Sequence, residues 1–226
     1  MKSTWHNPWF SIPFLILYNV GLLINYQVSH GDEILYFNAW RVEPLNSLFR
    51  FFTLLGEVWA YGFFALLMLL VGRYRYAILI ILVGFFTLPI QYYLKDVLAV
   101  DRPLSYFEKL DRMQEVTRVF GVELNSGQTS FPSGHTIGAF ALYSVLAMIF
   151  AEKRPRFGAL FAFLGASVAL SRVFLVQHFL PDVLFGALIG LLIGEGVGWL
   201  SRAPGFQGIK ALDGNLLGIP LPAKRP

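Results

Sequence analysis

The feature that most constrains this chain is a series of long stretches with almost no charge. Six apolar runs can be delimited, at about 9–28, 51–71, 76–94, 136–151, 157–176 and 183–200. Several approach the ~20 residues that an α-helix needs to cross the hydrocarbon core of a bilayer. They are too long and too uniformly apolar to be the strands of a membrane barrel, which alternate in polarity. The runs therefore predict an all-α integral membrane protein, a bundle of six transmembrane helices.

The composition agrees with this class and excludes others. Hydrophobic residues make up 56% of the chain and charged residues only 14%, whereas soluble domains carry about 25% charged residues. The absence of cysteine excludes disulfides, thiolate metal sites and thiol catalysis. We expect one membrane domain, residues 1–200, followed by a basic Gly/Pro-rich tail, residues 201–226, that is poorly ordered.

The positions of the basic residues predict how the helices are oriented. Six spans put both termini on one side, and the short loops 72–76 and 152–156, together with Lys2 and the tail, carry the excess of Lys and Arg. The positive-inside rule then places both termini in the cytoplasm, with the protein in the inner or plasma membrane. The longest polar segment, 96–130, becomes extracytoplasmic, and its part 106–119 is expected to form an amphipathic helix at the interface. The net charge of +4 is thus a topology signal, and no nucleic-acid partner is expected.

The first polar cluster opens the fourth run and reads FPSGH, residues 131–135. Gly134 permits close approach of the backbone to a ligand, and Ser133 adds a hydroxyl donor. The free N–H groups and the dipole of a helix start favour an anion. His135 stands beside that position and could donate a proton to a leaving oxygen. A plain loop-to-helix turn with a capping Ser explains these residues equally well.

The second cluster closes the third run with two cations. Lys95 and Arg102 bracket six residues, and Pro103 stiffens the chain that follows. Two fixed cations near one point would hold phosphate oxygens, Arg in a bidentate manner. Asp96 and Asp101 could pair with them instead. Taken alone, a snorkelling Lys and a surface Arg are the simpler explanation, because both are common at helix ends.

The third cluster, residues 171–182, reads SRVFLVQHFLPD and joins the fifth run to the sixth. Arg172 falls in the last turns of a membrane helix, where an Arg is costly and usually functional. Pro181 opens the sixth helix and leaves His178 in the turn before it. Asp182 lies in the first helical turn, where the dipole favours its ionised form. Such an Asp can hold one nitrogen of His178 as N–H and leave the other free to attack. The alternative is a helical hairpin with an interfacial His and a capping Asp.

Together the three clusters resemble the signature of the type 2 phosphatidic acid phosphatase (PAP2) superfamily. That signature reads K-x6-R-P, then P-S-G-H, then S-R-x5-H-x3-D. Every position is present in this chain, as Lys95, Arg102, Pro103, Pro132, Ser133, Gly134, His135, Ser171, Arg172, His178 and Asp182. The resemblance covers about 9–200 and leaves out the tail.

The resemblance implies a PAP2-type bundle and a histidine phosphatase that needs neither metal nor cofactor. His178 would be the nucleophile that forms a phosphohistidine, and Asp182 would orient it. His135 would protonate the leaving group and then activate water. The phosphate would be held by Lys95, Arg102, Ser133, Gly134 and Arg172.

The expected activity is hydrolysis of a lipid phosphate or polyprenyl diphosphate at the extracytoplasmic (periplasmic) face. Candidate substrates are undecaprenyl diphosphate, phosphatidic acid, phosphatidylglycerophosphate and a lipid A phosphate, and the sequence does not choose among them. The bilayer and this lipid are the expected partners. A lipid-linked phosphotransferase with the same phosphoenzyme, or a non-catalytic scaffold or transporter, are the alternatives. The intact nucleophile, orienting residue and acid weigh against the scaffold.

Three further features of the runs invite interpretation. A glycine recurs at every fourth position of the sixth run, as Gly186, Gly190, Gly194 and Gly198. Such a stripe permits close helix packing, preferably inside the bundle and alternatively in a homodimer. Glu195, nearer the cytoplasmic end, is expected to pair with a loop Arg. Glu57 lies on the side of the proposed site, where it could shape the access of the substrate or be an ordinary interfacial acid.

Overall fold

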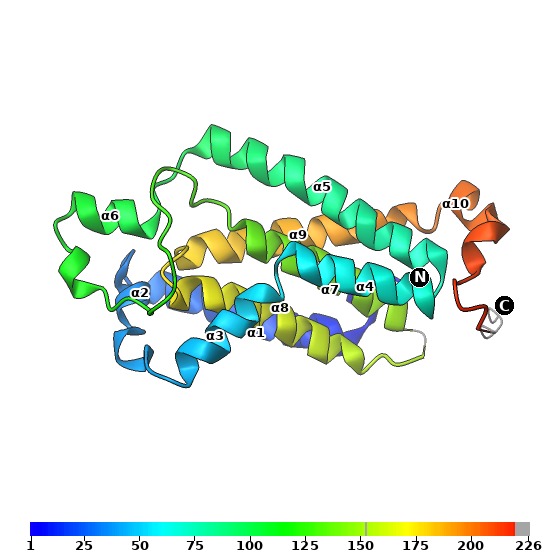
Figure 1. Ribbon diagram of the computed structural model, residues 1–226, viewed down its shortest axis with the longest axis horizontal. Helices are drawn as coiled ribbons and strands as arrows, with labels where there is room; N and C mark the ends of the chain where they lie inside the picture. Colours follow the sequence, from blue (N-terminus) through cyan, green and yellow to red (C-terminus); the bar gives the residue numbers. More distant parts are fainter. Residues whose placement is uncertain (152, 220–226) are drawn as a thin grey trace.

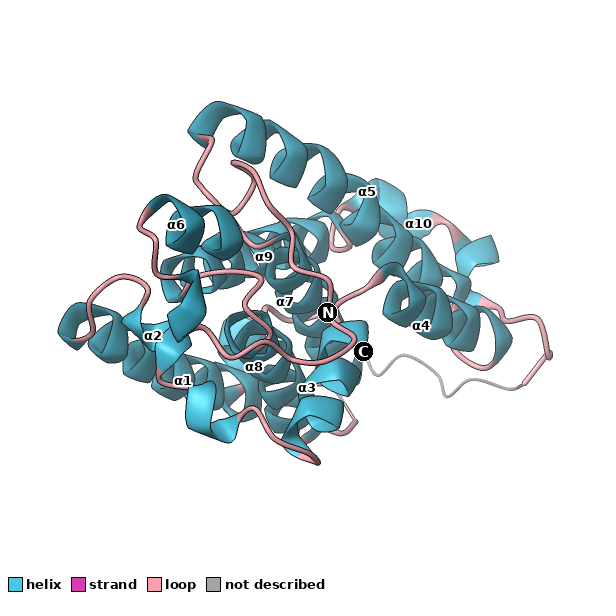
Figure 2. Cartoon of the chain, turned by 60° about the vertical axis from the view of Figure 1, so that its left-hand side comes forward, coloured by secondary structure: helices cyan, strands magenta, loops and turns pink. Residues whose placement is uncertain are grey.

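The computed structural model describes residues 1–151 and 153–219, and all regular structure in this part of the chain is helical. The α-helices are α1 (Pro8–Gln27), α2 (Asp32–Leu35), α3 (Leu45–Leu54), α4 (Val58–Leu70), α5 (Tyr74–Leu98), α6 (Pro103–Lys109), α7 (Gly134–Phe150), α8 (Phe157–Phe174), α9 (Leu180–Leu200) and α10 (Pro204–Gly208). Short 3₁₀ turns are η1 (Thr4–His6), η2 (Asn38–Trp40), η3 (Met113–Glu115) and η4 (Lys210–Asp213). The long helices form one bundle, with α2 and α6 at one end and the N-terminus and α10 at the other (Figure 1). The segment between α6 and α7 is mostly loop (Figure 2).

The helices include several that are suited to a bilayer. Four are long and apolar enough to cross a membrane: α1, the span that α5 begins, α8 and α9. The helices α3 and α4 pass the same test together but are bent by 57° at their junction. Helix α7 is apolar but has only 17 residues. The described residues thus form an all-helical, multi-pass membrane protein with four candidate spans, or five if the bent pair is one span.

The second apolar run, 51–71, is not the single straight helix that the sequence predicts. It is divided between α3 and α4, and the break contains Gly56. A Cβ atom at Gly56 would lie 2.5 Å from Cγ1 of Val168 and 3.1 Å from the carbonyl oxygen of His135. The backbone therefore passes directly against α7 and α8 at this point. Glu57 is the residue that precedes α4. The bend between α3 and α4 therefore determines the position of the Glu57 side chain.

The polar segment after the third run also differs from expectation. Helix α5 continues past Lys95, which lies in its last turn, and ends before Ala99, whose φ of 44° is left-handed. The interfacial helix expected over 106–119 is not continuous. Helix α6 ends at Lys109, and Asp111 follows with a left-handed φ of 54°. The left-handed residue turns the chain, so the apolar face that the sequence suggested is interrupted.

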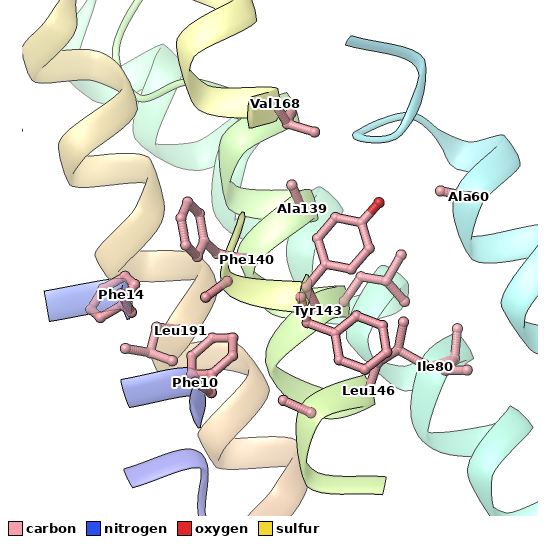
Figure 3. Close-up of a cluster of buried hydrophobic side chains, with 14 of the residues drawn as sticks. Phe10, Phe14, Ala60, Ile80, Ala139, Phe140, Tyr143, Leu146, Val168 and Leu191 are labelled. Carbon is pink, nitrogen blue, oxygen red and sulfur yellow. The ribbon is translucent and has the colours of Figure 1, made fainter. Parts of the chain in front are cut away.

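Helix α7 is the central element of the bundle. Its residues from Thr136 to Met148 are all buried, because α5, α8 and α9 pack around it while α1 lies along α8. Figure 3 shows side chains of α1, α7 and α9 meeting in the core, among them Phe14, Phe140 and Leu191. Because neighbouring helices enclose α7, it can be shorter than a helix that must span the bilayer in contact with lipid.

The glycine stripe of α9 faces this central helix. A Cβ atom at Gly190 would lie 2.9 Å from Cβ of Phe140, and one at Gly186, Gly194 or Gly198 would also meet atoms of α7. All four glycines are buried. The expectation of close packing inside the bundle therefore agrees with the structure. The homodimer through this stripe is wrong, because α7 already occupies the surface that a partner would need.

The tail is better ordered than its composition suggests. Asp213 Oδ1 accepts hydrogen bonds from Arg75 Nε at 2.7 Å and from Arg73 Nη1 at 3.0 Å. The backbone N–H of Leu216 donates to the carbonyl oxygen of Leu69 at 2.8 Å. These bonds attach the described part of the tail to the C-terminal end of α4 and the N-terminal end of α5. Residues 220–226 lie outside the part that the structure describes.

Glu195 has a partner other than the one expected. Its Oε1 accepts hydrogen bonds from the backbone N–H of Thr4, at 2.8 Å, and from the Thr4 hydroxyl. The expected pair with a loop Arg is therefore wrong, because the N-terminal turn η1 supplies the hydrogen-bond donors to the carboxylate. The bond ties the start of the chain to α9.

Candidate active site

The turn between α8 and α9 carries a fully buried histidine. His178 has 1% of its surface exposed. Helix α8 ends at Phe174, and Val176 adopts a left-handed φ of 58°. The backbone N–H groups of Gln177 and His178 then both donate to the carbonyl oxygen of Arg172, at 2.9 and 3.2 Å. This helix-ending turn places His178 between the helices, where the sequence predicted it.

Two neighbours define which nitrogen of His178 carries the proton. Its Nδ1 lies 3.4 Å from Oδ2 of Asp182, and its Nε2 lies 3.3 Å from Nη1 of Arg102. A guanidinium group donates hydrogen bonds and accepts none. We therefore assign Nε2 as the unprotonated acceptor and Nδ1–H as the donor to Asp182. The lone pair of Nε2 points toward the cationic side of the site.

Asp182 is held rigidly in the first turn of α9. Its side chain is buried, and Oδ2 accepts hydrogen bonds from the backbone N–H of Phe179 at 2.9 Å and from the Ser130 hydroxyl at 2.5 Å. The first of these bonds caps the helix. The sequence alone did not identify Ser130 as a site residue. Its position directly before the FPSGH segment is the signal by which it could have been found.

Positive charge converges on His178 from three elements. Burial lowers the pKa of His178 well below its ordinary value. The positive charges of Arg102, Arg172 and Lys95 lower it further. These cations come from the start of α6, the end of α8 and the end of α5. The structure therefore brings together residues that are separated by up to somewhat more than a third of the chain.

The cations keep donors available for an anion. Arg172 is buried, and its Nη1 donates to the Thr53 hydroxyl, but its buried Nε has no hydrogen-bond partner among the described residues. The side-chain ammonium of Lys95 makes no hydrogen bond or ion pair within the part of the chain that the structure covers. A buried, unsatisfied donor is costly unless a ligand completes it. The arrangement suits a bound phosphoryl group.

The start of α7 forms another wall of the site. Ser133 is completely buried, and its backbone N–H donates to the carbonyl oxygen of Asp182 at 3.1 Å, so this N–H is not free for a ligand. A Cβ atom at Gly134 would lie 3.7 Å from Nζ of Lys95 and would collide with the amide oxygen of Gln91. A side chain at position 134 would have to displace the amide of Gln91, so Gly134 lets Gln91 and Lys95 approach the start of α7. Gln91 is a neighbour that the sequence reasoning did not single out.

His135 occupies the more open side of the site. Its Nε2 lies 3.7 Å from Oε1 of Glu57, and each of these side chains is 33% exposed. The charges of Lys95, Arg102 and Arg172 act on it. His135 therefore lies within the same electrostatic cluster as His178 but has access to the surface.

Comparison with known proteins places the chain in a family. The profile of the PAP2 superfamily matches residues 73–202, which include all three clusters. Phosphatidylglycerophosphatase B of Bacillus subtilis is 33% identical over 104 residues, 43% of this chain and 51% of that protein. Lipid A 1-phosphatase of Porphyromonas gingivalis is 33% identical over 72 residues, 32% of this chain and 16% of that protein. The aligned region thus spans about half or less of these relatives.

Two crystal structures share the fold. LpxE of Aquifex aeolicus superposes with a TM-score of 0.63 at 22% identity, over 76% of this chain and 96% of that chain. A transmembrane PAP2-type phosphatidylglycerolphosphate phosphatase of Bacillus subtilis superposes with a TM-score of 0.59 at 24% identity, over 85% of this chain and 94% of that chain. At these identities the likeness concerns the fold alone. Taken with the matched profile, it shows that this chain belongs to the PAP2 superfamily and has its transmembrane fold.

Proposed function

We propose that the protein is an integral membrane phosphatase that hydrolyses a lipid phosphate through a phosphohistidine intermediate. The observation that carries the proposal is the setting of His178. Its Nε2 lies beside Arg102 and its Nδ1 beside Asp182, so we assign Nε2 as the unprotonated nitrogen. The positive charges of Arg102, Arg172 and Lys95 act on the ring. A neutral imidazole in a cationic setting is suited to attack phosphorus, because the cations stabilise charge on the phosphoryl oxygens.

In the first step Nε2 of His178 forms a bond to phosphorus, and the bond from phosphorus to the lipid oxygen breaks. His135 gives its proton to that leaving oxygen. Asp182 stabilises the positive charge that develops on the ring of His178. Arg102, which contacts Nε2 in the free protein, turns to the phosphoryl oxygens together with Lys95 and Arg172.

In the second step the phosphohistidine is hydrolysed. Neutral His135 takes a proton from a water molecule, whose oxygen attacks phosphorus, and the bond from phosphorus to Nε2 breaks. Inorganic phosphate leaves, and His178 returns to its original state. Both steps use only side chains of this chain, so we expect activity to survive EDTA.

The names of the matched relatives favour a phosphomonoester on a lipid. One relative is a phosphatidylglycerophosphatase and another a lipid A 1-phosphatase. We propose that the substrate is of this type, with phosphatidic acid and undecaprenyl diphosphate as further members of a test panel. The same phosphoenzyme could pass its phosphoryl group to an alcohol, and release of free phosphate distinguishes hydrolysis from that transfer.

We further propose the orientation that the basic residues suggest. The site lies at the end of the bundle opposite to the N-terminus and α10 (Figure 1). With six spans, the bent α3–α4 pair and the enclosed α7 counting as one each, both termini are cytoplasmic and the site is extracytoplasmic.

The deciding experiment is phosphate release from the lipid panel by purified protein in detergent. The variant His178→Asn should reduce the turnover by at least about 10³-fold, as loss of a nucleophile does elsewhere. His6→Asn, an exposed histidine outside the site, is the matched control and should keep wild-type activity. Wild-type release by His178→Asn would overturn the proposal.

A further inference from the structure

Glu57 lies beside the proposed proton donor, and the chain departs from a straight helix to place it there. The break between α3 and α4 presses Gly56 against the backbone of His135. Glu57 follows at the start of α4, with Oε1 at 3.7 Å from Nε2 of His135. The two side chains form an ion pair whenever His135 is protonated.

Burial opposes the protonated form of His135, and so do the other charged groups around it. Lys95 on α5, Arg102 before α6 and Arg172 on α8 all act on it with positive charge, and His178 faces it from the turn before α9. Glu57 is the carboxylate within 4.0 Å of His135 among the described residues. A histidine that must deliver a proton needs a counter-charge in such surroundings.

We propose that Glu57 is a positioning residue that keeps His135 protonated for the departure of the lipid oxygen. The inference rests on the phosphatase function proposed above. The carboxylate faces Nε2, so Nδ1 is the atom that gives its proton to the leaving oxygen as the phosphorus–oxygen bond breaks. The neutral ring then accepts a proton from water in the second step. At 3.7 Å the pair is longer than a hydrogen bond, so the ring can change its protonation state without losing a hydrogen bond to Glu57.

A rival role can be separated from this one. Glu57 also acts electrostatically on Arg172. If its effect were only to weaken the grip of Arg172 on phosphate, its removal would lower KM at every pH and leave the pH dependence of kcat unchanged. A positioning role predicts the opposite pattern, a shift of the pH profile.

The test compares Glu57→Gln with Glu108→Gln, an exposed glutamate on α6 that serves as the matched control. The first readout is the NMR titration of the His135 ring, assigned by its absence in His135→Asn. In Glu57→Gln the midpoint should move to lower pH by about one unit, because a partly exposed ion pair is worth about 1 kcal/mol. Glu57→Asp should recover part of the shift, and Glu108→Gln should show none.

The second readout is kcat against pH for phosphate release. The limb on which activity falls as pH rises should move in the same direction in Glu57→Gln. An unchanged midpoint of the His135 titration in a folded Glu57→Gln protein overturns the inference. A wild type that releases no phosphate overturns the proposed function instead, and the titration still decides whether Glu57 controls His135.

Discussion

At the scale of single residues, the chemistry depends on how His178 is fixed. Asp182 and Arg102 contact opposite nitrogens of one ring, so the direction of the lone pair follows from the donor and acceptor types of these neighbours. Asp182 is fixed in turn by Ser130 and by the helix start. A buried network in which each member has a partner is rigid, and each member is costly to remove.

The carboxylate of Asp182 should matter to the rate more than to binding. We expect Asp182→Asn to lower kcat by about 10²–10⁴-fold with little change in KM, because the amide favours the wrong tautomer of His178 and offers no negative charge. Steady-state phosphate release measures both constants. A folded variant with kcat within about tenfold of wild type would contradict the role of Asp182.

The lowered pKa of His178 makes a prediction for the free protein. Because burial and then the neighbouring cations lower this pKa, protonation requires a lower pH than for an ordinary histidine, and the ring should stay neutral on acidification from pH 8 to about pH 6. NMR of labelled histidine should show the neutral Nδ1–H form throughout this range. If the His178 ring titrated with the midpoint of an ordinary histidine, the cations would not converge on the ring.

At the scale of elements, α9 is positioned by its glycines. The stripe lets α9 approach α7 so closely that the carbonyl oxygen of Asp182 reaches the backbone N–H of Ser133. The helix that supplies Asp182 and the helix that begins beside the proposed phosphate site are thereby joined. Packing within the bundle therefore sets distances within the site.

Two alanine substitutions on α9 should have opposite effects on stability. Gly190→Ala places a methyl group against the Cβ of Phe140 and the backbone of Ala141, at 2.9 and 3.0 Å, and should cost roughly 1–3 kcal/mol. Gly196→Ala meets nothing within 4 Å and should gain about 0.5–1 kcal/mol from helix propensity. Thermal unfolding in detergent measures both. Equal effects would show that α7 does not fill the stripe.

At the scale of the whole molecule, the open question is which end of the bundle faces the cytoplasm. The chain has no cysteine, so single cysteines can be introduced without a background. Ser126 in the loop between α6 and α7 and Ala211 in the turn η4, after α10, are both exposed. Figure 1 shows α6 and α10 at opposite ends of the bundle.

We expect Ser126→Cys to react with a membrane-impermeant maleimide in intact cells. Ala211→Cys should react only after the membrane is permeabilised, because the positive-inside rule places the tail in the cytoplasm. The cysteine-free wild type is the control for background labelling. The reverse pattern of labelling would invert the topology and place the site in the cytoplasm.

Much of the protein follows from sequence alone, for reasons that are local. Helical membrane segments are determined by the hydrophobicity of consecutive residues, so the class and most helix positions could be predicted. The turn at His178 follows from Pro181 three residues later, and the spacing to Asp182 places both residues at one helix start. These are properties of neighbouring residues, and the signature made them recognisable.

Other features depend on contacts between residues that are far apart in the chain, and only the tertiary structure decided them. The bend at Gly56 arises because α7 and α8 leave room for a backbone but not for a side chain. The pairing of Glu57 with His135, of Ser130 with Asp182 and of the glycine stripe with α7 each require two distant segments to meet. Hydrophobicity determines that such helices pack together, but the side-chain volumes and polar groups that face each other determine which surfaces meet.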